Sequence, residues 1–403
     1  MFTNKHRFPI SCLTLAAGPL TGISRKVSAR HCRQTWLAFF LAAITISCDG
    51  KHQSQNGESK PKRLQTVTIN NIEPRRDVAG EIIDAHGGCL QLFGGRFYLY
   101  GTAYGTNETS LALNCPFRVY SSPDLERWTY EGELLKEQPS GIYTRPCVVF
   151  NPHTHKYVLW YNWFPKLWHG QTAAAISDTP VGPFTIVNPN VPVFGFRPGD
   201  TNVFGSCPGD GSLFVDDDGT GYYIYTSMGD GYAIRVERLK PDFLGPMGWM
   251  SSMLVKGGEA PVLFRRNNLY YVLCGPLCPD CPEGSEVLVL SSTSPLGPFT
   301  ARSNINRRSG NGAPIKPGQD IRVASRYDEG IPIVPAQQTW IARISMPEGP
   351  AFIWMADRWG SCPDGVKGHD FQFWSAPLQF SPDGDIMPIK FVERWDITWA
   401  WGD

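Results

Sequence analysis

An excess of charge of either sign is missing from this chain. Lys plus Arg and Asp plus Glu each number 37, so the 403 residues carry a formal net charge of zero. A protein that binds nucleic acid neutralises phosphates with a basic surface, so a nucleic-acid partner is not expected. Helical periodicity is also missing. After residue 64 no stretch sustains a helical repeat of apolar residues, so we expect few helices.

The first fifty residues lack an apolar run that is long enough to span a bilayer. The run from Trp36 to Ser47 has 12 residues and follows several basic residues, whereas a spanning helix needs about 20. Such a run has the length of a signal-peptide core, and the adjoining Ser47-Cys48 is similar to the lipidation site of bacterial lipoproteins. We therefore expect residues 1–48 to be a signal peptide or lipoprotein-type leader, with an uncleaved anchor as the alternative.

Export then defines where the protein is expected to work. It would be periplasmic, secreted, or a cell-surface lipoprotein attached to the membrane through lipidated Cys48. Residues 49–65 are polar and have no periodicity, which is typical of a flexible chain segment. We place a flexible tether at residues 49–74.

A complete zinc motif is missing as well. Cys278-Pro-Asp-Cys281 has the spacing of half a zinc site, but neither a second C-x-x-C nor an H-x3-H accompanies it, so we expect no metal centre and no cofactor. An even number of cysteines in an exported chain suggests disulfides, whose pairing the sequence does not determine. The eight that follow the leader are Cys89, Cys115, Cys147, Cys207, Cys274, Cys278, Cys281 and Cys362.

Turn residues and aromatic residues are abundant. The chain has 41 Gly, 34 Pro and 12% aromatics, which is typical of many short strands joined by tight turns. From residue 75 onward, an aromatic-rich strand followed by a second strand recurs five times, about once every 65 residues. The aromatic-rich strands are 96–101, 156–161, 221–226, 268–273 and 351–356. Two units end in the same Gly-Pro-Phe-Thr, at 182–185 and 297–300.

These repeats predict an all-β fold, a five-bladed β-propeller over residues 75–403, with a β-sandwich as the alternative. Sheets packed around an axis bury a continuous aromatic core, which isolated hairpins cannot do. We expect the aromatic-rich strand of each unit to be the one that lines the central channel. Loops at one end of the channel would then form a pocket.

Two acidic segments have the same form. Asp210 lies between Gly209 and Gly211, and Glu259 lies between Gly258 and Ala260, each just before a short apolar strand. Each carboxylate can therefore point into a common space at the start of its strand. Two carboxyl groups in different environments are what acid-catalysed cleavage of a glycosidic bond requires.

Six segments in sequence carry a resemblance to a known family. They are Asp84-Ala-His-Gly-Gly88, Ser121-Ser-Pro-Asp-Leu-Glu-Arg-Trp128, Arg145-Pro-Cys-Val-Val-Phe150, Gly211-Ser-Leu-Phe-Val-Asp-Asp-Asp-Gly219, Gly258-Glu-Ala-Pro261 and Asp357-Arg-Trp359. In this order they resemble glycoside hydrolase family 43, a family of five-bladed propellers, and most closely its exo-β-1,3-galactanase branch.

The resemblance implies roles for particular residues. Glu259 matches the general acid, and Asp210 matches the carboxylate that orients the acid and raises its pKa. Gln337 is the candidate for holding the attacking water, with Gln338 as the neighbouring alternative. A calcium ion occupies the channel in some relatives, so a structural calcium remains open.

Other residues are candidates for binding the sugar. His86 stands where most of the family has an Asp base, so it would act in catalysis or bind sugar, and Asp84 shares its strand face. Arg145 would contact sugar hydroxyls or Asp210. Aromatic rings suit the C–H faces of sugars, and the candidates are Trp163, Phe164, Trp168 and Trp359.

Two segments depart from the galactanase pattern. Thr144 precedes Arg145 where the branch usually has Glu, and the loop 274–283 is rich in Cys and Pro. Galactose, xylose and arabinose therefore all remain candidate sugars.

We therefore expect an exported glycoside hydrolase that removes terminal sugars from a polysaccharide or oligosaccharide with inversion. The acid and the group that holds the water would stand about 6.5–9.5 Å apart. The alternatives are a catalytically inactive carbohydrate-binding propeller and a propeller that binds protein partners at the cell surface.

Overall fold

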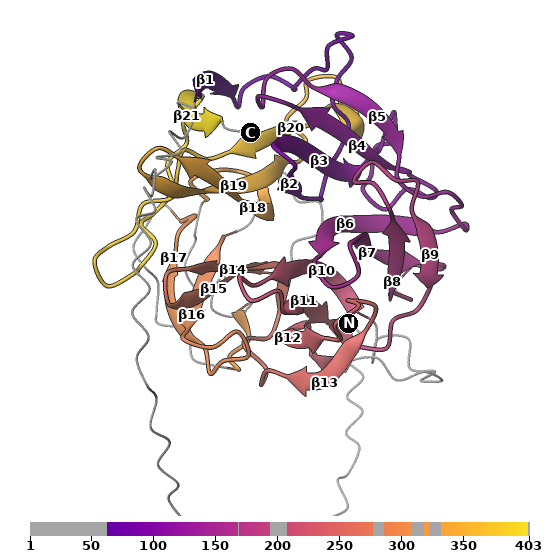
Figure 1. The fold of residues 1–403 in the computed structure, drawn as a ribbon, viewed down its shortest axis with the longest axis vertical. Coiled ribbons are helices and arrows are strands. Elements are labelled where there is room, and N and C mark those ends of the chain that lie inside the picture. The colour runs from indigo at the N-terminus through magenta and orange to yellow at the C-terminus, as the bar shows by residue number, and fades with distance from the viewer. Residues whose placement is uncertain are drawn as a thin grey trace, which may run out of the picture. The chain divides into compact units, whose positions relative to one another are not determined.

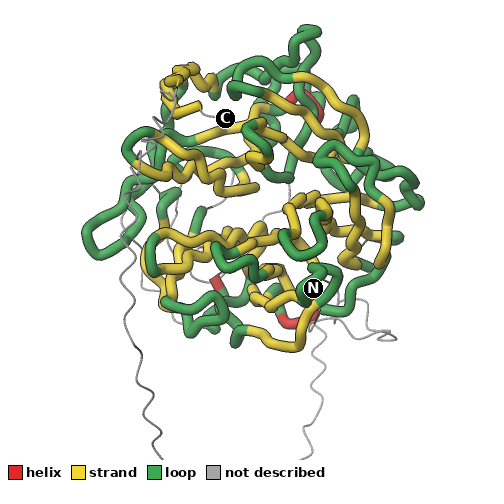
Figure 2. The backbone as a smooth tube through the Cα atoms, in the orientation of Figure 1, coloured by secondary structure: helices red, strands yellow, loops and turns green. Residues whose placement is uncertain are grey.

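The computed structural model describes residues 63–167, 169–193, 208–276, 286–307, 318–321 and 332–401. Most of these residues form strands, and the only 3-10 helices among the described residues are η1 (Met228–Asp230) and η2 (Lys367–His369). No helix in this part of the chain is long and apolar enough to cross a bilayer. The predicted scarcity of helices is confirmed (Figure 2).

Five antiparallel sheets follow one another along the chain and surround a central channel (Figure 1). Blade one contains β2 (Leu90–Phe93), β3 (Arg96–Thr102), β4 (Phe117–Ser122) and β5 (Thr129–Glu133). Blade two contains β6 (Ile142–Asn151), β7 (Lys156–Phe164), β8 (Gln171–Ser177) and β9 (Thr185–Asn188). Blade three contains β10 (Pro208–Val215), β11 (Gly221–Ser227), β12 (Ala233–Leu239) and β13 (Pro246–Met250). Blade four contains β14 (Gly258–Arg266), β15 (Leu269–Pro276), β16 (Leu288–Ser292) and β17 (Thr300–Asn304). Blade five contains β18 (Gln337–Met346), β19 (Gly349–Arg358) and β20 (Phe371–Trp374). The predicted five-bladed β-propeller is confirmed.

The strand that faces the channel is not the one that the sequence indicated. The aromatic-rich strands are β3, β7, β11, β15 and β19, and each is the second strand of its sheet. The innermost strands are β2, β6, β10, β14 and β18 (Figure 1). A second strand is covered on both faces by neighbouring blades, so every residue of β11 is buried. Three of the innermost strands, β10, β14 and β18, instead begin with small or polar residues.

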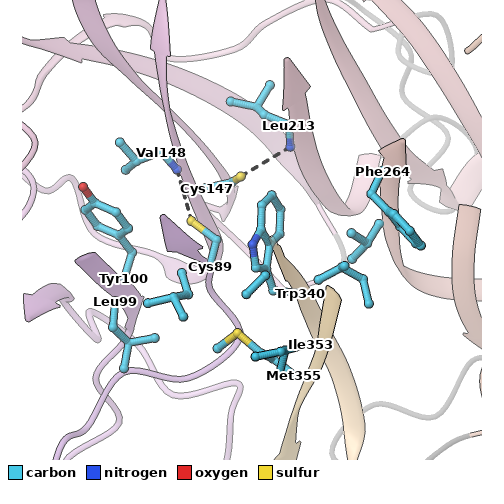
Figure 3. Packing of buried hydrophobic residues seen from close by; sticks show 14 of the residues in the cluster. Cys89, Leu99, Tyr100, Cys147, Val148, Leu213, Phe264, Trp340, Ile353 and Met355 are labelled. Carbon is cyan, nitrogen blue, oxygen red and sulfur yellow. Dashed lines mark hydrogen bonds between the residues drawn. The ribbon is translucent and has the colours of Figure 1, made fainter. Parts of the chain in front are cut away.

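Side chains join neighbouring blades close to the channel. The backbone N–H of Val148 donates to Cys89 Sγ at 3.5 Å, and the N–H of Leu213 donates to Cys147 Sγ at 3.4 Å. Figure 3 shows both contacts beside the buried ring of Trp340. These bonds satisfy backbone donors that no strand ladder reaches at a blade boundary.

The described cysteines form no disulfides. Cys89, Cys115, Cys147, Cys274 and Cys362 are free thiols, so the expected disulfides are absent from this part of the chain. Burial raises the pKa of the Cys274 thiol to about 12. These side chains serve as small apolar groups and weak acceptors. Cys207, Cys278 and Cys281 lie outside the described residues.

A two-stranded sheet joins the two ends of the propeller. It pairs β1 (Arg63–Asn70) with β21 (Arg394–Trp401), from Arg63 opposite Trp401 to Asn70 opposite Arg394. The sequence placed residues 63–70 in the tether, yet Val67 and Ile69 are buried and alternate with the exposed Thr66 and Thr68. Alternation of buried and exposed residues is typical of a strand that has one buried face. The segment is short and follows polar residues, so its sequence does not reveal the strand.

Asn71 fixes the two-stranded sheet to blade five. Its side chain is fully buried, and its Nδ2 donates to the carbonyl oxygens of Trp374 at 3.0 Å and Val392 at 2.9 Å. Its Oδ1 accepts the backbone N–H of Trp374 at 2.9 Å. One side chain therefore satisfies three buried backbone groups between segments about 300 residues apart along the chain.

We predict that Asn71→Ala lowers the free energy of unfolding by about 2–4 kcal/mol, because each buried backbone group left unpaired costs about 1–3 kcal/mol. Asn70→Ala is the matched control. The Asn70 side chain bonds to Glu73 at the surface and accepts the partly exposed backbone N–H of Ile72, which water can replace, and we expect the substitution to cost less than about 1 kcal/mol. Urea unfolding followed by tryptophan fluorescence measures both. Equal effects of the two substitutions would contradict this role of Asn71.

Candidate active site

A pocket of about 110 Å³ opens at the end of the channel where the innermost strands begin. Its floor includes Arg145, Asp210, Glu259 and Gln337, one from each of four blades. Its walls come from the ends of the second strands of the blades or from just beyond them, namely Tyr104, Phe164, Met228 and Trp359. The polar groups that the sequence singled out therefore gather at one place, inside an aromatic and apolar rim.

The opposite end of the channel holds a larger cavity, of about 270 Å³. Its wall comes from the far ends of the same innermost strands and includes Phe150, Phe264 and Arg343. None of the predicted site residues lines it. The smaller pocket is therefore the candidate active site.

β-bulges lie at or beside the four floor residues. The pairing register shifts in four of the five innermost strands: between Thr144 and Cys147 in β6, Pro208 and Gly211 in β10, Glu259 and Val262 in β14, and Gln338 and Trp340 in β18. A bulge resets the alternation of side chains and often lies beside a functional site. Arg145 and Ala260 adopt φ angles of 56° and 50°, a strained conformation for residues with a Cβ.

Asp210 accepts hydrogen bonds from two donors. Arg145 Nη2 donates to its Oδ2 at 2.8 Å, and the backbone N–H of Ala260 donates to the same oxygen at 3.1 Å. Burial lowers the pKa of Arg145, but Asp210, with Glu259 and Asp357 nearby, raises it above its ordinary value overall. Arg145 therefore remains a cation. Ala260 follows Glu259 directly in the chain, so its bond to Asp210 places the Asp210–Arg145 ion pair next to Glu259.

Glu259 lies beside Gln337, and Trp359 fixes the orientation of that amide. An indole N–H can only donate, so Gln337 turns its Oε1 toward Trp359 Nε1, at 2.9 Å. Gln337 Nε2 then faces Glu259 and donates to its Oε1 at 2.5 Å. Glu259 is 5% exposed. A proton on this carboxyl group would thus sit on Oε2.

This contact corrects one expectation. The group predicted to hold the water was to stand about 6.5–9.5 Å from the acid, yet Gln337 Nε2 and Glu259 Oε1 are 2.5 Å apart. Both residues begin innermost strands of adjacent blades, which brings their side chains into contact. Gln338, the neighbouring alternative, is fully buried and faces away from the pocket. Its Nε2 donates to the carbonyl oxygen of Ala260 at 2.6 Å.

The predicted pair Asp84 and His86 lies behind the pocket rather than in its wall. His86 is fully buried, and its Nδ1 lies 3.1 Å from Asp357 Oδ1. Asp84 Oδ1 and Oδ2 accept the backbone N–H groups of Tyr104 and Gly105 at 2.9 and 2.7 Å. Both side chains are already occupied by protein groups, so in this arrangement neither reaches a sugar in the pocket.

The two flanking carboxylates make His86 an imidazolium. Burial by itself lowers its pKa, but the charge and hydrogen bond of Asp357, the charge of Asp84 and the carbonyl oxygen of Gly368 outweigh burial and raise it to about 9. Asp357 also accepts the backbone N–H of Gly87 at 2.7 Å. His86 thus joins blade one to β19, just before Trp359.

The aromatic candidates divide between the pocket and the protein interior. Trp359 and Phe164 line the pocket. Trp163 stacks on Tyr143, with ring centroids 6.4 Å apart, because adjacent residues of β7 point to opposite faces. Trp168 lies outside the described residues.

Tyr104, Met228 and Leu111 line the pocket but were not predicted from the sequence. A signal for two of them was available, since Tyr104 and Met228 follow the ends of β3 and β11 just as Trp359 follows β19. Asp357 belonged to a recognised segment but received no role. Of the two departures from the galactanase pattern, Thr144 lines the pocket, and residues 277–283 lie outside the described residues.

The middle of the channel does not fit a calcium ion. Its cavity has a volume of about 10 Å³, and its lining includes Arg145, Cys89, Cys147, Asp210, Ser212 and Thr339. Calcium takes six to eight oxygen ligands, whereas the single carboxylate of this lining, Asp210, is already paired with Arg145.

Comparison with known proteins agrees with this geometry. The model of the family described as glycosyl hydrolases family 43 matches residues 95–320, more than half of the chain. The chain belongs to glycosyl hydrolases family 43. A comparison with curated protein sequences finds no match.

Solved structures of family 43 share the fold. An exo-β-1,3-galactanase from Clostridium thermocellum is 25% identical, with a TM-score of 0.63 over 81% of this chain and 66% of that one. A family 43 β-1,3-galactosidase is 24% identical, with a TM-score of 0.63 over 83% of this chain and 64% of that one. An exo-β-1,3-galactanase from Phanerochaete chrysosporium, solved with β-1,3-galactotriose, is 22% identical, with a TM-score of 0.62 over 82% and 68%. The chain thus spans slightly less than two thirds of the first two structures.

We predict that protonated His86 stabilises the fold. Its folded pKa of about 9 lies above the ordinary 6.5, so the stabilisation is complete below pH 6.5 and is lost as the pH rises through 9. Relative to His86→Gln, the free energy of unfolding of the native protein should fall by about 2 kcal/mol between pH 7 and pH 9.5. Urea unfolding across this range measures the difference, and parallel curves for the two proteins would refute it.

Proposed function

We propose that this protein is an exo-acting glycosidase that removes terminal galactose from a β-1,3-linked galactan. The observation that carries the proposal is the buried Glu259, fixed by Gln337 and next to the Asp210–Arg145 ion pair at the floor of a pocket. The exo-β-1,3-galactanase from Clostridium thermocellum, with its similar fold, supports galactose over xylose and arabinose, which remain the other candidate sugars.

In this proposal, Glu259 is the general acid. Its Oε1 is occupied by Gln337 Nε2, so Oε2 carries the proton toward the glycosidic oxygen of the substrate. Proton donation by a positioned carboxyl group lowers the barrier because the departing oxygen is a poor leaving group when charged. Asp210, which is paired with Arg145, stabilises the positive charge that develops on the sugar ring.

The proposed displacement is a single step with inversion. It requires a water molecule on the face of the sugar opposite Glu259, about 6.5–9.5 Å from the acid. In the present arrangement Gln337 contacts the acid, so in this mechanism it positions Glu259 and another group of the pocket holds the water. The Gln337 amide keeps one further N–H and one lone pair with which it can bind a sugar hydroxyl.

A catalytically inactive carbohydrate-binding propeller is the second candidate. The observation that favours it is the pocket wall, in which Asp210 and Glu259 are the only carboxylates among the described residues. Asp210 is paired with Arg145 and Glu259 is the proposed acid, so neither serves as the base. This candidate predicts binding of oligosaccharides without any turnover.

We also propose that the protein is exported and anchored through lipidated Cys48, with a periplasmic or secreted form as the alternative. The support is the basic and apolar leader that ends at Ser47-Cys48. Expressed in a bacterial host, the mature chain should begin at an acylated Cys48, and Cys48→Ala should abolish palmitate labelling. Mass spectrometry of the N-terminus decides. A cytoplasmic protein that retains Met1 would refute export.

We predict that Glu259→Gln lowers kcat on β-1,3-galactan by about 10²–10⁴-fold, because the proton donor is lost while the shape is kept. Glu348→Gln at the surface is the matched control and should leave kcat unchanged. Sugar release from β-1,3-galactan, arabinan and xylan identifies the substrate, and NMR of the first product should show the inverted anomer.

Three outcomes of this experiment would count against the proposal. A retained anomer would refute the single displacement. An unchanged kcat in Glu259→Gln would remove Glu259 from the acid role. Binding of galactotriose without turnover by the native protein would favour the carbohydrate-binding propeller.

A further inference from the structure

The loop between β19 and β20 gathers three metal-ligating side chains outside the pocket. Cys362, Asp364 and His369 lie within eight residues of one another, and one ligand atom from each lies within 4.8 Å of the other two. We propose that these residues form a binding site for a divalent transition-metal ion such as zinc, coupled to the pocket through the loop that carries Trp359. The proposed glycosidase activity does not depend on this inference.

The three ligand types select a zinc-like ion. Zinc binds thiolate, imidazole and carboxylate in tetrahedral geometry, with bonds of about 2.0–2.3 Å, and thiolate disfavours calcium and magnesium. His369 Nδ1 and Asp364 Oδ2 are 2.7 Å apart, in hydrogen-bond contact. Two ligands of a tetrahedral zinc ion stand about 3.3 Å apart, so a shift of about half an ångström would admit the ion between them. On binding, Cys362 releases its thiol proton and the imidazole coordinates through a nitrogen without a proton. Water would complete a fourth position.

Backbone contacts already shape the loop for this role. Asp364 Oδ1 accepts the N–H of Val366 at 2.9 Å, which leaves Oδ2 facing His369. Asp370, which is buried, accepts the N–H groups of Gly360 at 2.8 Å and Cys362 at 3.1 Å. The thiol and the carboxylate are therefore held by a local fold that an incoming ion does not have to create, so less ordering entropy opposes binding.

One cation of the loop is held by groups outside the cluster. Lys367 is buried, and its Nζ lies 4.5 Å from the ring centroid of Trp359 and 3.7 Å from Asp370 Oδ2. These contacts direct its charge toward the pocket side of the loop. The three ligands occupy the more exposed side, where an ion from solvent can reach them.

The loop is fixed to the propeller close to the ligands. A Cβ at Gly368 would lie 2.6 Å from Asp84 Oδ2 and 2.7 Å from the carbonyl oxygen of Gly105, so Gly368 packs where no other residue fits. The neighbouring His369 therefore cannot shift far without breaking this contact. Metal binding would tie His369 to Cys362 and so stabilise the segment between Trp359 and Gly368.

Cobalt(II) titration of the full chain under reducing conditions tests the site. The background carries Cys278→Ser and Cys281→Ser, because that C-x-x-C offers a second pair of thiols. We expect one equivalent of cobalt to bind with a thiolate-to-cobalt charge-transfer band, and zinc to displace it. Cys362→Ser should abolish the band, and His369→Gln should weaken binding roughly tenfold or more. His153→Gln, a substitution at an exposed histidine outside the cluster, is the control and should bind as the background does.

Two results would overturn the proposal. One is the absence of a charge-transfer band in a background protein whose circular dichroism shows a folded state. The other is a band of unchanged intensity in Cys362→Ser. Asp364→Asn provides a further check, because it leaves the thiol unchanged and can keep the hydrogen bond from the N–H of Val366. It removes one charged ligand and should therefore still weaken cobalt binding.

Discussion

Five sheets converge on one channel, and their innermost strands cannot pair with one another. The site depends on this constraint. Polar side chains take over the pairing at the blade boundaries: Ser212 Oγ donates to the carbonyl oxygen of Pro261 at 2.8 Å, and Gln338 Nε2 donates to that of Ala260 at 2.6 Å. Bulges in the same strands supply the irregular backbone that such contacts need. The residues at the bulges are released from the sheet alternation, and they form the floor of the pocket.

The charges around the pocket are separated into layers. At the floor, Arg145 neutralises Asp210, while Glu259 has a neutral amide as its neighbour. Behind the wall, protonated His86 lies between Asp84 and Asp357. Buried charges are costly unless they are paired. Each layer therefore places a cation beside its carboxylates, Arg145 at the floor and His86 behind the wall.

The segment from Asp357 to Asp370 links these layers to the surface. It begins at the partner of His86, supplies Trp359 to the pocket, and returns to His86 through the carbonyl oxygen of Gly368 at 3.4 Å. A change in this loop therefore reaches the amide of Gln337, which Trp359 orients. An ion held by the loop would act on the pocket by the same route.

Local pattern alone determined the all-β class, the five repeated units and the two carboxylates at strand starts, because strand alternation and turn residues are short-range signals. The strand next to the channel was misjudged, since the aromatic content of β3 or β7 indicates burial but not which neighbour buries it. His86 and Trp163 look like sugar ligands in the sequence, and only the packing shows that His86 is fully buried and that the half-buried Trp163 stacks on Tyr143. The contact between Gln337 and Glu259, 78 residues apart, arises from the angle at which blades four and five meet. No local pattern encodes that angle, because it is decided by the packing of the whole ring.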